Sequence, residues 1–357
     1  MNARIALVLV VLLAVLGGGA LVIRNQQGTQ KPAASGTLGQ PLLKGLKAAD
    51  VAGVSIRDPK GTITLARKDD RWTIAERADY TAELEKVKEF VVKAIELKIG
   101  QVEPIGEKDR ARLLLDATGG TVVEFKGADG KVLGALTIGK KYFKSEPANP
   151  DKALGDGRFV MVPGNDKEVF IVSDPLAQAS TKSSDWVSKA GFQVEKVKSL
   201  EAKLAVGGGW RIERTGDNAD WKLDGAKPGE KLEVTRANSA SYTLSSVDVF
   251  DVLPKDAKPE GMDAPTTLVA TTLDGLTYTL RVGKLSGDHY PVTVSVEGEP
   301  KAEGKDAEDR QKKLAERLPK EKALASHVLL VPKGKIDDAM KPRAELLEQK
   351  KDDAKKK

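Results

Sequence analysis

The amino-acid sequence predicts an α+β fold, in which an N-terminal transmembrane helix precedes duplicated units of small antiparallel sheet packed on a helix. Three observations lead to this prediction. The chain opens with a long apolar run, its alternating stretches are interrupted by one of helical period, and the same short motifs occur twice. With 357 residues, of which 40% are hydrophobic, the chain is long enough for two domains of ordinary size.

The apolar run covers residues 5–23, with Ile5 and Ile23 as its ends, and contains no charged residue. At about 1.5 Å per residue, a helix of this length matches a hydrocarbon core of about 30 Å. An uncleaved signal anchor fits the run better than a cleaved signal peptide, because hydrophobic residues resume after the small residues 17–20. We expect residues 1–24 to be a cytoplasmic leader and anchor. The protein would then cross the inner membrane once, with the lipid bilayer as a partner and its body outside the cytoplasm.

The anchor is followed by a polar stretch, residues 25–41, which is rich in Gly, Ser and Gln and reads as a flexible tether. The formal net charge of +6 comes from the two ends of the chain. Residues 301–357 carry +5 and residues 1–41 carry +3, which leaves −2 for residues 42–300. A body this close to neutral predicts no nucleic-acid partner.

Residues 42–190 are predicted to form the first unit. Short alternating stretches at 54–56, 63–67 and 72–74 indicate an antiparallel meander, and apolar residues at helical spacing predict an amphipathic helix within 82–99. Two more strands are expected at 121–126 and 133–138. A connecting hairpin at 158–162 and 169–172 and a helix at 174–189 complete the predicted unit.

Residues 191–347 are predicted to form the second unit, and residues 348–357 a disordered lysine-rich tail. The helix of this second unit, near 237–247, is predicted to be weaker than that of the first unit because it carries Ser and Thr. A charged, helix-prone stretch at 305–323 precedes a buried strand at 328–331, and a short terminal helix is expected at 336–347.

The two units share motifs at a nearly constant separation. Strand-like residues 63–67 correspond to 210–214, and Trp72 corresponds to Trp221. Further on, residues 121–125 correspond to 267–271, and the Gly-Lys pairs that follow at Gly139 and Gly283 also correspond. The separations lie between 144 and 149 residues. A duplication is the simplest explanation of this pattern.

The sequence predicts no catalytic, cofactor-binding or metal-binding residue. The chain has no Cys and two His, and we expect His289 in an exposed loop and His327 partly buried beside the last strand. Neither the glycines at 207–209 nor the Gly-Lys pairs have the context of a phosphate-binding loop, so we expect a hairpin turn and strand ends. Tryptophans at strand positions could stack on sugars, but core packing is favoured. No cofactor is therefore predicted.

Most of residues 45–347 resembles the bacterial family known as domain of unknown function 4340. The resemblance rests on a single N-terminal span, on residues 51–56, on the strand at 63–67, on Trp72-Thr-Ile74 with the helix after it, and on the strand ending at Lys140. The weaker second helix and the insertion at 301–325 depart from the family pattern. Such proteins often accompany ABC-type transporters and gliding-motility auxiliary proteins.

These observations predict a membrane-anchored extracytoplasmic protein without enzymatic activity. It would serve as an accessory or scaffold of an ABC-type transport complex or a gliding-related envelope complex, with ABC-type transporter subunits as partners. The alternative is a periplasmic hydrolase that acts on cell-wall or polysaccharide material through carboxylates and tryptophans. A cleft that gathers two carboxylates within about 5–10 Å would favour the enzyme.

The predicted topology can be tested with reporters fused to the C-terminus. A phosphatase that is active only after export is expected to be active in this fusion, because the charge-free run should carry the long body across the membrane. A fluorescent protein that matures only in the cytoplasm is expected to stay dark. The reverse pair of results would show that the topology is wrong.

Overall fold

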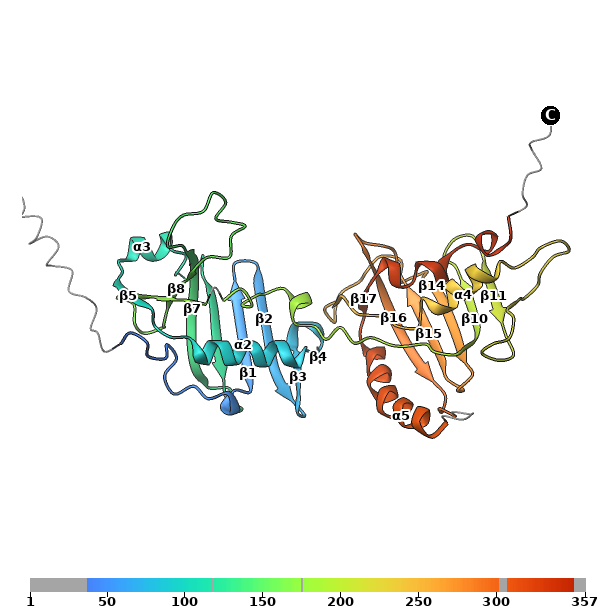
Figure 1. Cartoon of the computed structure of the whole chain (residues 1–357), viewed down its shortest axis with the longest axis horizontal. Helices are drawn as coiled ribbons and strands as arrows, with labels where there is room; N and C mark the ends of the chain where they lie inside the picture. Colours follow the sequence, from blue (N-terminus) through green and yellow to red (C-terminus); the bar gives the residue numbers. More distant parts are fainter. Residues whose placement is uncertain (1–36, 117, 175, 302–306, 350–357) are drawn as a thin grey trace, which may run out of the picture. The chain divides into compact units, whose positions relative to one another are not determined.

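The computed structural model describes residues 37–116, 118–174, 176–301 and 307–349 (Figure 1). The predicted span at residues 5–23 lies outside these ranges, so it stays a prediction. Within the described ranges, no helix combines the length and the apolar character needed to cross a bilayer. The described chain is mostly β-sheet with a few helices, as the predicted α+β class requires.

The first sheet has nine strands in the order β4-β3-β2-β1-β6-β7-β8-β9-β5. Its pairs from β6 to β9 are antiparallel, and so are β2–β3, β3–β4 and β5–β9. The strands are β1 (Gly53–Asp58), β2 (Gly61–Lys68), β3 (Arg71–Ile74), β4 (Tyr80–Thr81), β5 (Gln101–Pro104), β6 (Thr121–Lys126), β7 (Val132–Tyr142), β8 (Gly157–Met161) and β9 (Glu168–Val172).

The second sheet has eight strands in the order β12-β11-β10-β14-β15-β16-β17-β13, and every pair is antiparallel. The strands are β10 (Val197–Lys203), β11 (Gly209–Glu213), β12 (Lys222–Leu223), β13 (Asp251–Val252), β14 (Thr266–Thr272), β15 (Thr277–Val282), β16 (His289–Glu297) and β17 (Leu329–Pro332).

Apart from the additional edge strand β4, the two sheets have the same strand order. Strands β1 to β3 take the places of β10 to β12, β6 to β9 those of β14 to β17, and β5 that of β13. The motifs that recur in the sequence lie at corresponding places, with Trp72 on β3 and Trp221 directly before β12. The hairpin predicted to connect the units is instead part of the first sheet, where it forms β8 and β9.

Each sheet is accompanied by one helix that begins in the same way. Helix α2 (Leu84–Glu96) follows Glu83, whose backbone N–H donates to the Trp186 carbonyl at 2.6 Å. Helix α4 (Val234–Tyr242) follows Glu233, whose N–H donates to the Leu346 carbonyl at 2.8 Å. Both helices are therefore fixed at their start by a later segment of the chain, which makes Glu83 and Glu233 corresponding positions.

The two helices bury side chains of different size. On α2 the buried residues include Val87, Phe90 and Val91, and Phe90 meets Trp186 edge-on at 5.5 Å between ring centroids. The corresponding positions of α4 carry Ala237, Ala240 and Ser241. Figure 1 shows α2 crossing one face of the first sheet. The first sheet is thus covered by a longer helix with larger apolar side chains than the second.

Two further helices lie in the described part of the chain. Helix α3 (Glu107–Arg112) precedes a small core of Leu113, Leu115, Met161 and Val169 on the first sheet. Helix α5 (Ala307–Ala323) confirms the helix expected in the charged insertion, and it lies between β16 and β17 in sequence. The structure also places strands β5 and β13 where no strand was predicted.

Two helix predictions are wrong. Among the described residues of 174–189, the one helical element is the 3₁₀ turn Ser183–Asp185, because polar side chains bind the local backbone instead of allowing a helix. The Asp174 carboxylate accepts from the Leu176 N–H at 2.6 Å, and the Ser180 hydroxyl accepts from the Lys182 N–H at 3.2 Å. Residues 336–347 form the 3₁₀ turns Asp337–Met340 and Arg343–Leu346, which Pro342 separates.

The ends of the body reach further than the sequence suggested. Gly39 and Gln40 were expected in the tether, but both bind Ile99. The Gly39 N–H donates to the Ile99 carbonyl at 2.8 Å, and the Ile99 N–H donates to the Gln40 carbonyl at 3.0 Å. At the other end, the Glu348 N–H donates to the Lys231 carbonyl at 2.9 Å. These residues are therefore part of the folded structure, and the predicted tail from 350 onward lies outside the described residues.

The different packing of the two helices can be tested by exchanging one side chain. Phe90→Ala should lower the free energy of unfolding by about 3–5 kcal/mol, because it removes a buried ring and leaves a cavity. Ala240→Phe should cost about 1–3 kcal/mol by overpacking. Urea unfolding followed by circular dichroism measures both. Val92→Ala, at a position 43% exposed, is the control and should change stability by less than about 0.5 kcal/mol. A Phe90→Ala protein as stable as the control would contradict this account.

Candidate functional site

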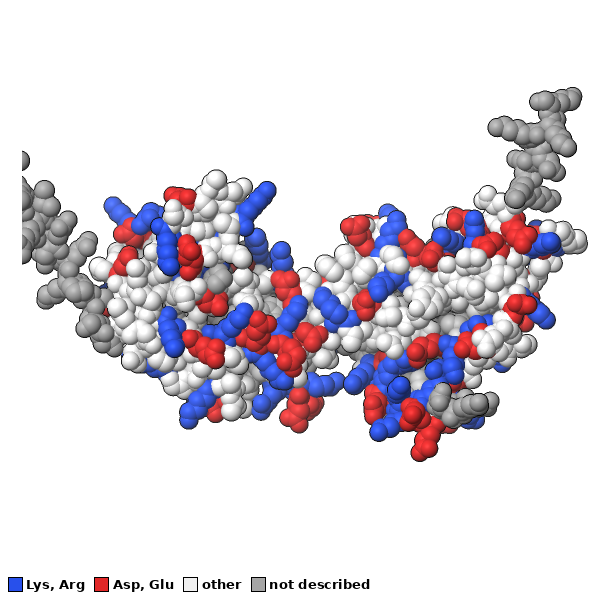
Figure 2. Space-filling view, viewed as in Figure 1, with Lys and Arg blue, Asp and Glu red and all other residues white. Residues whose placement is uncertain are grey.

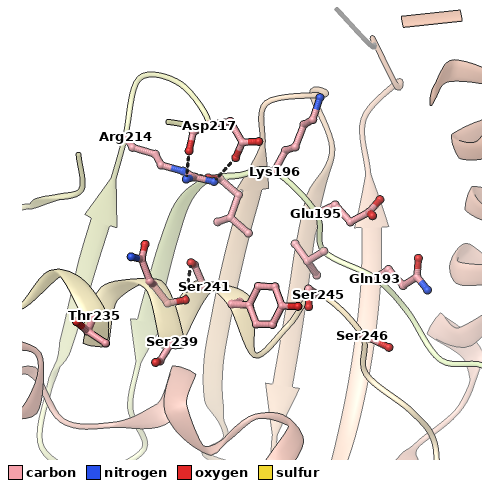
Figure 3. A pocket seen from close by; sticks show the side chains of 14 residues that line it. Gln193, Glu195, Lys196, Arg214, Asp217, Thr235, Ser239, Ser241, Ser245 and Ser246 are labelled. Carbon is pink, nitrogen blue, oxygen red and sulfur yellow. Dashed lines mark hydrogen bonds and ion pairs between the residues drawn. The ribbon is translucent and has the colours of Figure 1, made fainter. Parts of the chain in front are cut away.

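An open groove with a volume of about 790 Å³ lies beside α4 (Figure 3). It lies entirely in the second half of the chain. Three segments line it: the run into β10, the turn after β11, and α4 with the turn that follows. The lining residues are Gln193, Val194, Glu195, Lys196, Val197, Arg214, Asp217, Thr235, Asn238, Ser239, Ser241, Tyr242, Ser245 and Ser246.

Part of the groove is lined by the turn that follows the early end of α4. Counted from Glu83 and Glu233, residues 243–246 correspond to 93–96, which form the last turn of α2. In the second half the helix ends at Tyr242, and the chain continues as a turn in which Ser245 and Ser246 line the groove. Thr, Ser and Asn weaken a helix because their side chains compete for backbone hydrogen bonds. The start is secured by Glu233, whose carboxylate accepts from the N–H groups of Thr235 and Arg236 at 3.0 Å each.

One end of the groove is organised by Arg214. Its Nε donates to the Val197 carbonyl at 2.8 Å, and its Nη2 donates to the Asp217 carboxylate at 2.7 Å. The guanidinium also lies over the Trp221 ring, 4.6 Å from the ring centroid, and the Trp221 indole N–H donates to Asn238 on α4 at 2.9 Å. Arg214 therefore joins β10, the turn after β11 and, through Trp221, the helix.

The opposite end is organised by α5. Arg317 donates to Gln193 at 2.7 Å and to the Glu195 carboxylate at 2.9 Å. Next to it the buried Glu321 carboxylate accepts from the Gln193 N–H at 2.9 Å and from the Tyr278 hydroxyl at 2.7 Å. Burial raises the pKa of Glu321 above its ordinary value, and burial likewise raises the pKa of Tyr278. The charged insertion thus anchors the run into β10, which borders the groove.

Hydroxyl groups make up most of the remaining lining. Figure 3 shows Thr235, Ser239 and Ser241 on α4, with Ser245 and Ser246 beyond its end. The Ser241 hydroxyl donates to the Asn238 carbonyl at 3.0 Å. Tyr242 lines the same groove with 76% of the residue exposed. The Ser and Thr hydroxyls and the Tyr242 phenol can each donate and accept hydrogen bonds, so the groove offers many neutral polar contacts.

The two histidines do not contribute to this groove. His289 is the first residue of β16 and stacks on Phe250 at 3.9 Å between ring centroids, so the expected exposed loop position is wrong. The loop is shorter than the sequence suggested, because β16 begins at His289 itself. His327 is half-buried before β17, as expected, with its Nδ1 2.9 Å from the Ser326 hydroxyl.

The tryptophans expected in the core are largely there. Trp186, Trp210 and Trp221 are 2–6% exposed, and Trp72 is half-buried. The Trp210 indole N–H donates to the Lys341 carbonyl at 2.7 Å. None of the three buried indoles presents a free face for a sugar ring.

The glycine motifs are structural features. Gly207 and Gly208 have φ of 90° and 82° in the hairpin between β10 and β11, as predicted. A Cβ at Gly139 would lie 2.4 Å from the Leu113 carbonyl oxygen, and one at Gly283 would lie 2.7 Å from the Glu260 carbonyl oxygen. The lysine after each glycine donates its N–H to that same carbonyl, at 2.9 and 2.8 Å. Both Gly-Lys pairs therefore mark a strand crossed closely by a loop.

Charges of both signs are interspersed over the face of the molecule seen in Figure 2. In the described ranges, no three His, Asp or Glu side chains are grouped so that they could hold a metal ion. The adjacent acidic pairs also serve separate contacts. Asp69 and Asp70 have φ of 47° and 61° in the β2–β3 turn, whereas Asp337 accepts from the Tyr290 hydroxyl at 2.9 Å and Asp338 pairs with Lys341 at 2.5 Å.

Sequence reasoning identified no residue of the groove as functional. Its members come from three segments whose proximity depends on the folded sheet, and they form no motif of fixed spacing. One signal was present in the sequence: the second helix carries Ser and Thr where the first carries apolar and charged residues. The Ser and Thr residues of the second helix are among those that line the groove.

Comparison with known proteins gives one match. Residues 72–265, more than half of the chain, match the family model described as Domain of unknown function (DUF4340). No curated protein matches, and no solved structure matches.

The environment of Glu321 predicts a pH dependence of stability. The folded protein holds the proton of Glu321 more tightly than the unfolded chain does. Protonation of Glu321 therefore contributes fully to the free energy of unfolding below the ordinary pKa of a glutamate, and this contribution is lost as the pH rises through the raised pKa. Glu321→Gln carries no titrating proton and should remove this part of the dependence. Urea midpoints measured between about pH 4 and 8 test this. Parallel curves for the two proteins would contradict it.

Proposed function

The chain belongs to the DUF4340 family, and on that premise we propose that it is a non-enzymatic binding protein of the cell envelope. Residues 5–23 would anchor it in the inner membrane, and its two sheets would act outside the cytoplasm as an accessory or scaffold of an ABC-type transport complex or a gliding-related complex. The apolar run and the resemblance of the sequence to this family support the anchor and the partner.

The observation that most directly supports a binding role over an enzymatic one is that the two carboxylates lining the groove are each paired with an arginine. Asp217 is paired with Arg214 at 2.7 Å, and Glu195 with Arg317 at 2.9 Å. An acid-base pair of the glycosidase type needs one carboxyl that donates a proton and one that attacks or activates water. Carboxylates held by arginines are stabilised as anions and fixed in place, which favours a structural role.

The shared strand order supports a duplication in which the helix of the second half became shorter and more polar than that of the first. The outermost strands are short: β4, β12 and β13 have two residues each, and β5 has four and ends at Pro104. Short edges of this kind discourage the addition of a foreign strand. We therefore assign partner binding to side-chain surfaces and not to strand edges.

The proposal predicts that the protein co-purifies with a transporter. Extraction in mild detergent and affinity capture of the full chain should recover a permease or an ATP-binding subunit, identified by mass spectrometry. A variant with residues 5–23 replaced by an unrelated single-span anchor is the control, since the body should retain the partner.

A protein that is captured alone and hydrolyses cell-wall material or a polysaccharide would contradict the proposal and establish the hydrolase alternative. Asp217→Asn and Glu195→Gln separate the two cases, because a hydrolase that used these carboxylates would lose its turnover in at least one variant.

A further inference from the structure

The outer face of α4 differs in kind from the outer face of α2. Counted from Glu83 and Glu233, Thr235, Asn238 and Tyr242 take the places of Glu85, Lys88 and Val92. On α2 the Lys88 ammonium pairs with the Glu85 carboxylate at 2.9 Å, as is usual on a solvated helix. On α4 the charges are replaced by hydroxyl and amide groups and an exposed ring, although these residues make a poorer helix.

The charged groups of the groove largely compensate one another. Arg214 is bound to Asp217, and Glu195 is bound to Arg317, so each carboxylate in the lining has its own arginine. Lys196 adds a cation to the lining, and Figure 3 shows its ammonium pointing away from the hydroxyl groups of α4. What faces a ligand along α4 is therefore a set of hydroxyls and amides that both donate and accept hydrogen bonds. Such a surface suits a neutral polar ligand better than an anion or a cation.

Tyr242 supplies the one large apolar surface in the lining. It is 76% exposed, and a phenol ring presents a flat face and a polar tip at low cost in conformational entropy. The other apolar side chains of the lining are Val194 and Val197, both buried in the base of the groove. The hot spots of protein interfaces usually lie in well-packed, desolvated pockets, whereas the exposed lining of this groove is mostly polar.

We propose that this groove binds a neutral oligosaccharide, with one sugar stacked on Tyr242 and its hydroxyls bound by Thr235, Asn238, Ser239 and Ser245. A volume of about 790 Å³ lies within the range of about 300–1,000 Å³ usual for ligand sites. The site goes beyond the partner role proposed above and does not depend on it, since a glycan-binding accessory and a glycan-binding protein without a transporter would both contain it.

The test uses the full chain in lipid nanodiscs, because maltoside detergents would present a competing sugar. The probes are cellotetraose, maltotetraose and the tetramer of N-acetylglucosamine, titrated by calorimetry at up to 10 mM. At least one probe should bind saturably. Tyr242→Ala should weaken that binding about tenfold, and Ser239→Arg, which places a long side chain in the groove, should abolish it.

Val92→Ala is the matched control on α2, and it should leave the affinity unchanged. Thermal melting of each variant shows whether the fold is kept, and Tyr242→Ala should keep it because the side chain is exposed. The proposal is overturned if none of the three probes binds, if Tyr242→Ala binds as well as the unaltered protein, or if Val92→Ala weakens binding as much. Loss of the transporter in affinity capture would leave this result untouched.

Discussion

Each sheet in this protein depends on one helix that covers part of a face, and the side chains which that helix buries decide what the face can do. On the first sheet, Phe90 and its apolar neighbours on α2 are buried, and Phe90 meets Trp186. On the second, Ala237, Ala240 and Ser241 take the corresponding places, and the helix stops one turn earlier. Since both helices start from the same kind of backbone contact, the difference lies in packing and length, not in topology.

This difference links the architecture to the proposed function. A longer helix with larger buried side chains covers the first sheet, while α4, the turn after it and two other segments line a polar groove on the second. The borders of the groove are fixed by Arg214 at one end and by Arg317 and Glu321 of α5 at the other. A site whose borders are held by buried or paired groups is preorganised, which reduces the entropy lost when a ligand binds.

The same contacts explain the structural role of the charged insertion. Helix α5 is rich in Lys and Glu, yet it buries Leu314, Leu318 and Glu321 against the second sheet, and Arg310 donates to the buried Asp274 carboxylate at 2.7 Å. An insertion of this kind would otherwise be a solvated surface helix. Here it holds the run into β10 in place.

Local patterns predicted the parts of the fold that depend on local physics. The alternating strands β1 to β3, helix α2 and strands β6 and β7 are found where their hydrophobic periods placed them. Strand β5 was missed because Gln101, Glu103 and Pro104 give no alternation, and its pairing with β9 is a long-range event. Residues 174–189 were wrongly predicted as a helix because Ser and Asp side chains bind the backbone there. The groove was not predictable, since it is formed only when residues 193–197, 214–217 and 235–246 come together in space.

The central claim, that divergence of the second helix created a glycan-binding face, can be tested most directly by photo-crosslinking in living cells. A benzophenone amino acid is placed at position 242 of the full chain and, as the matched site, at position 92. We expect an adduct at position 242 alone. Its electrophoretic mobility should change after treatment with glycan hydrolases, and the crosslinked molecule itself should resist protease digestion. An adduct at position 242 that is entirely protein, or equal adducts at both positions, would contradict it.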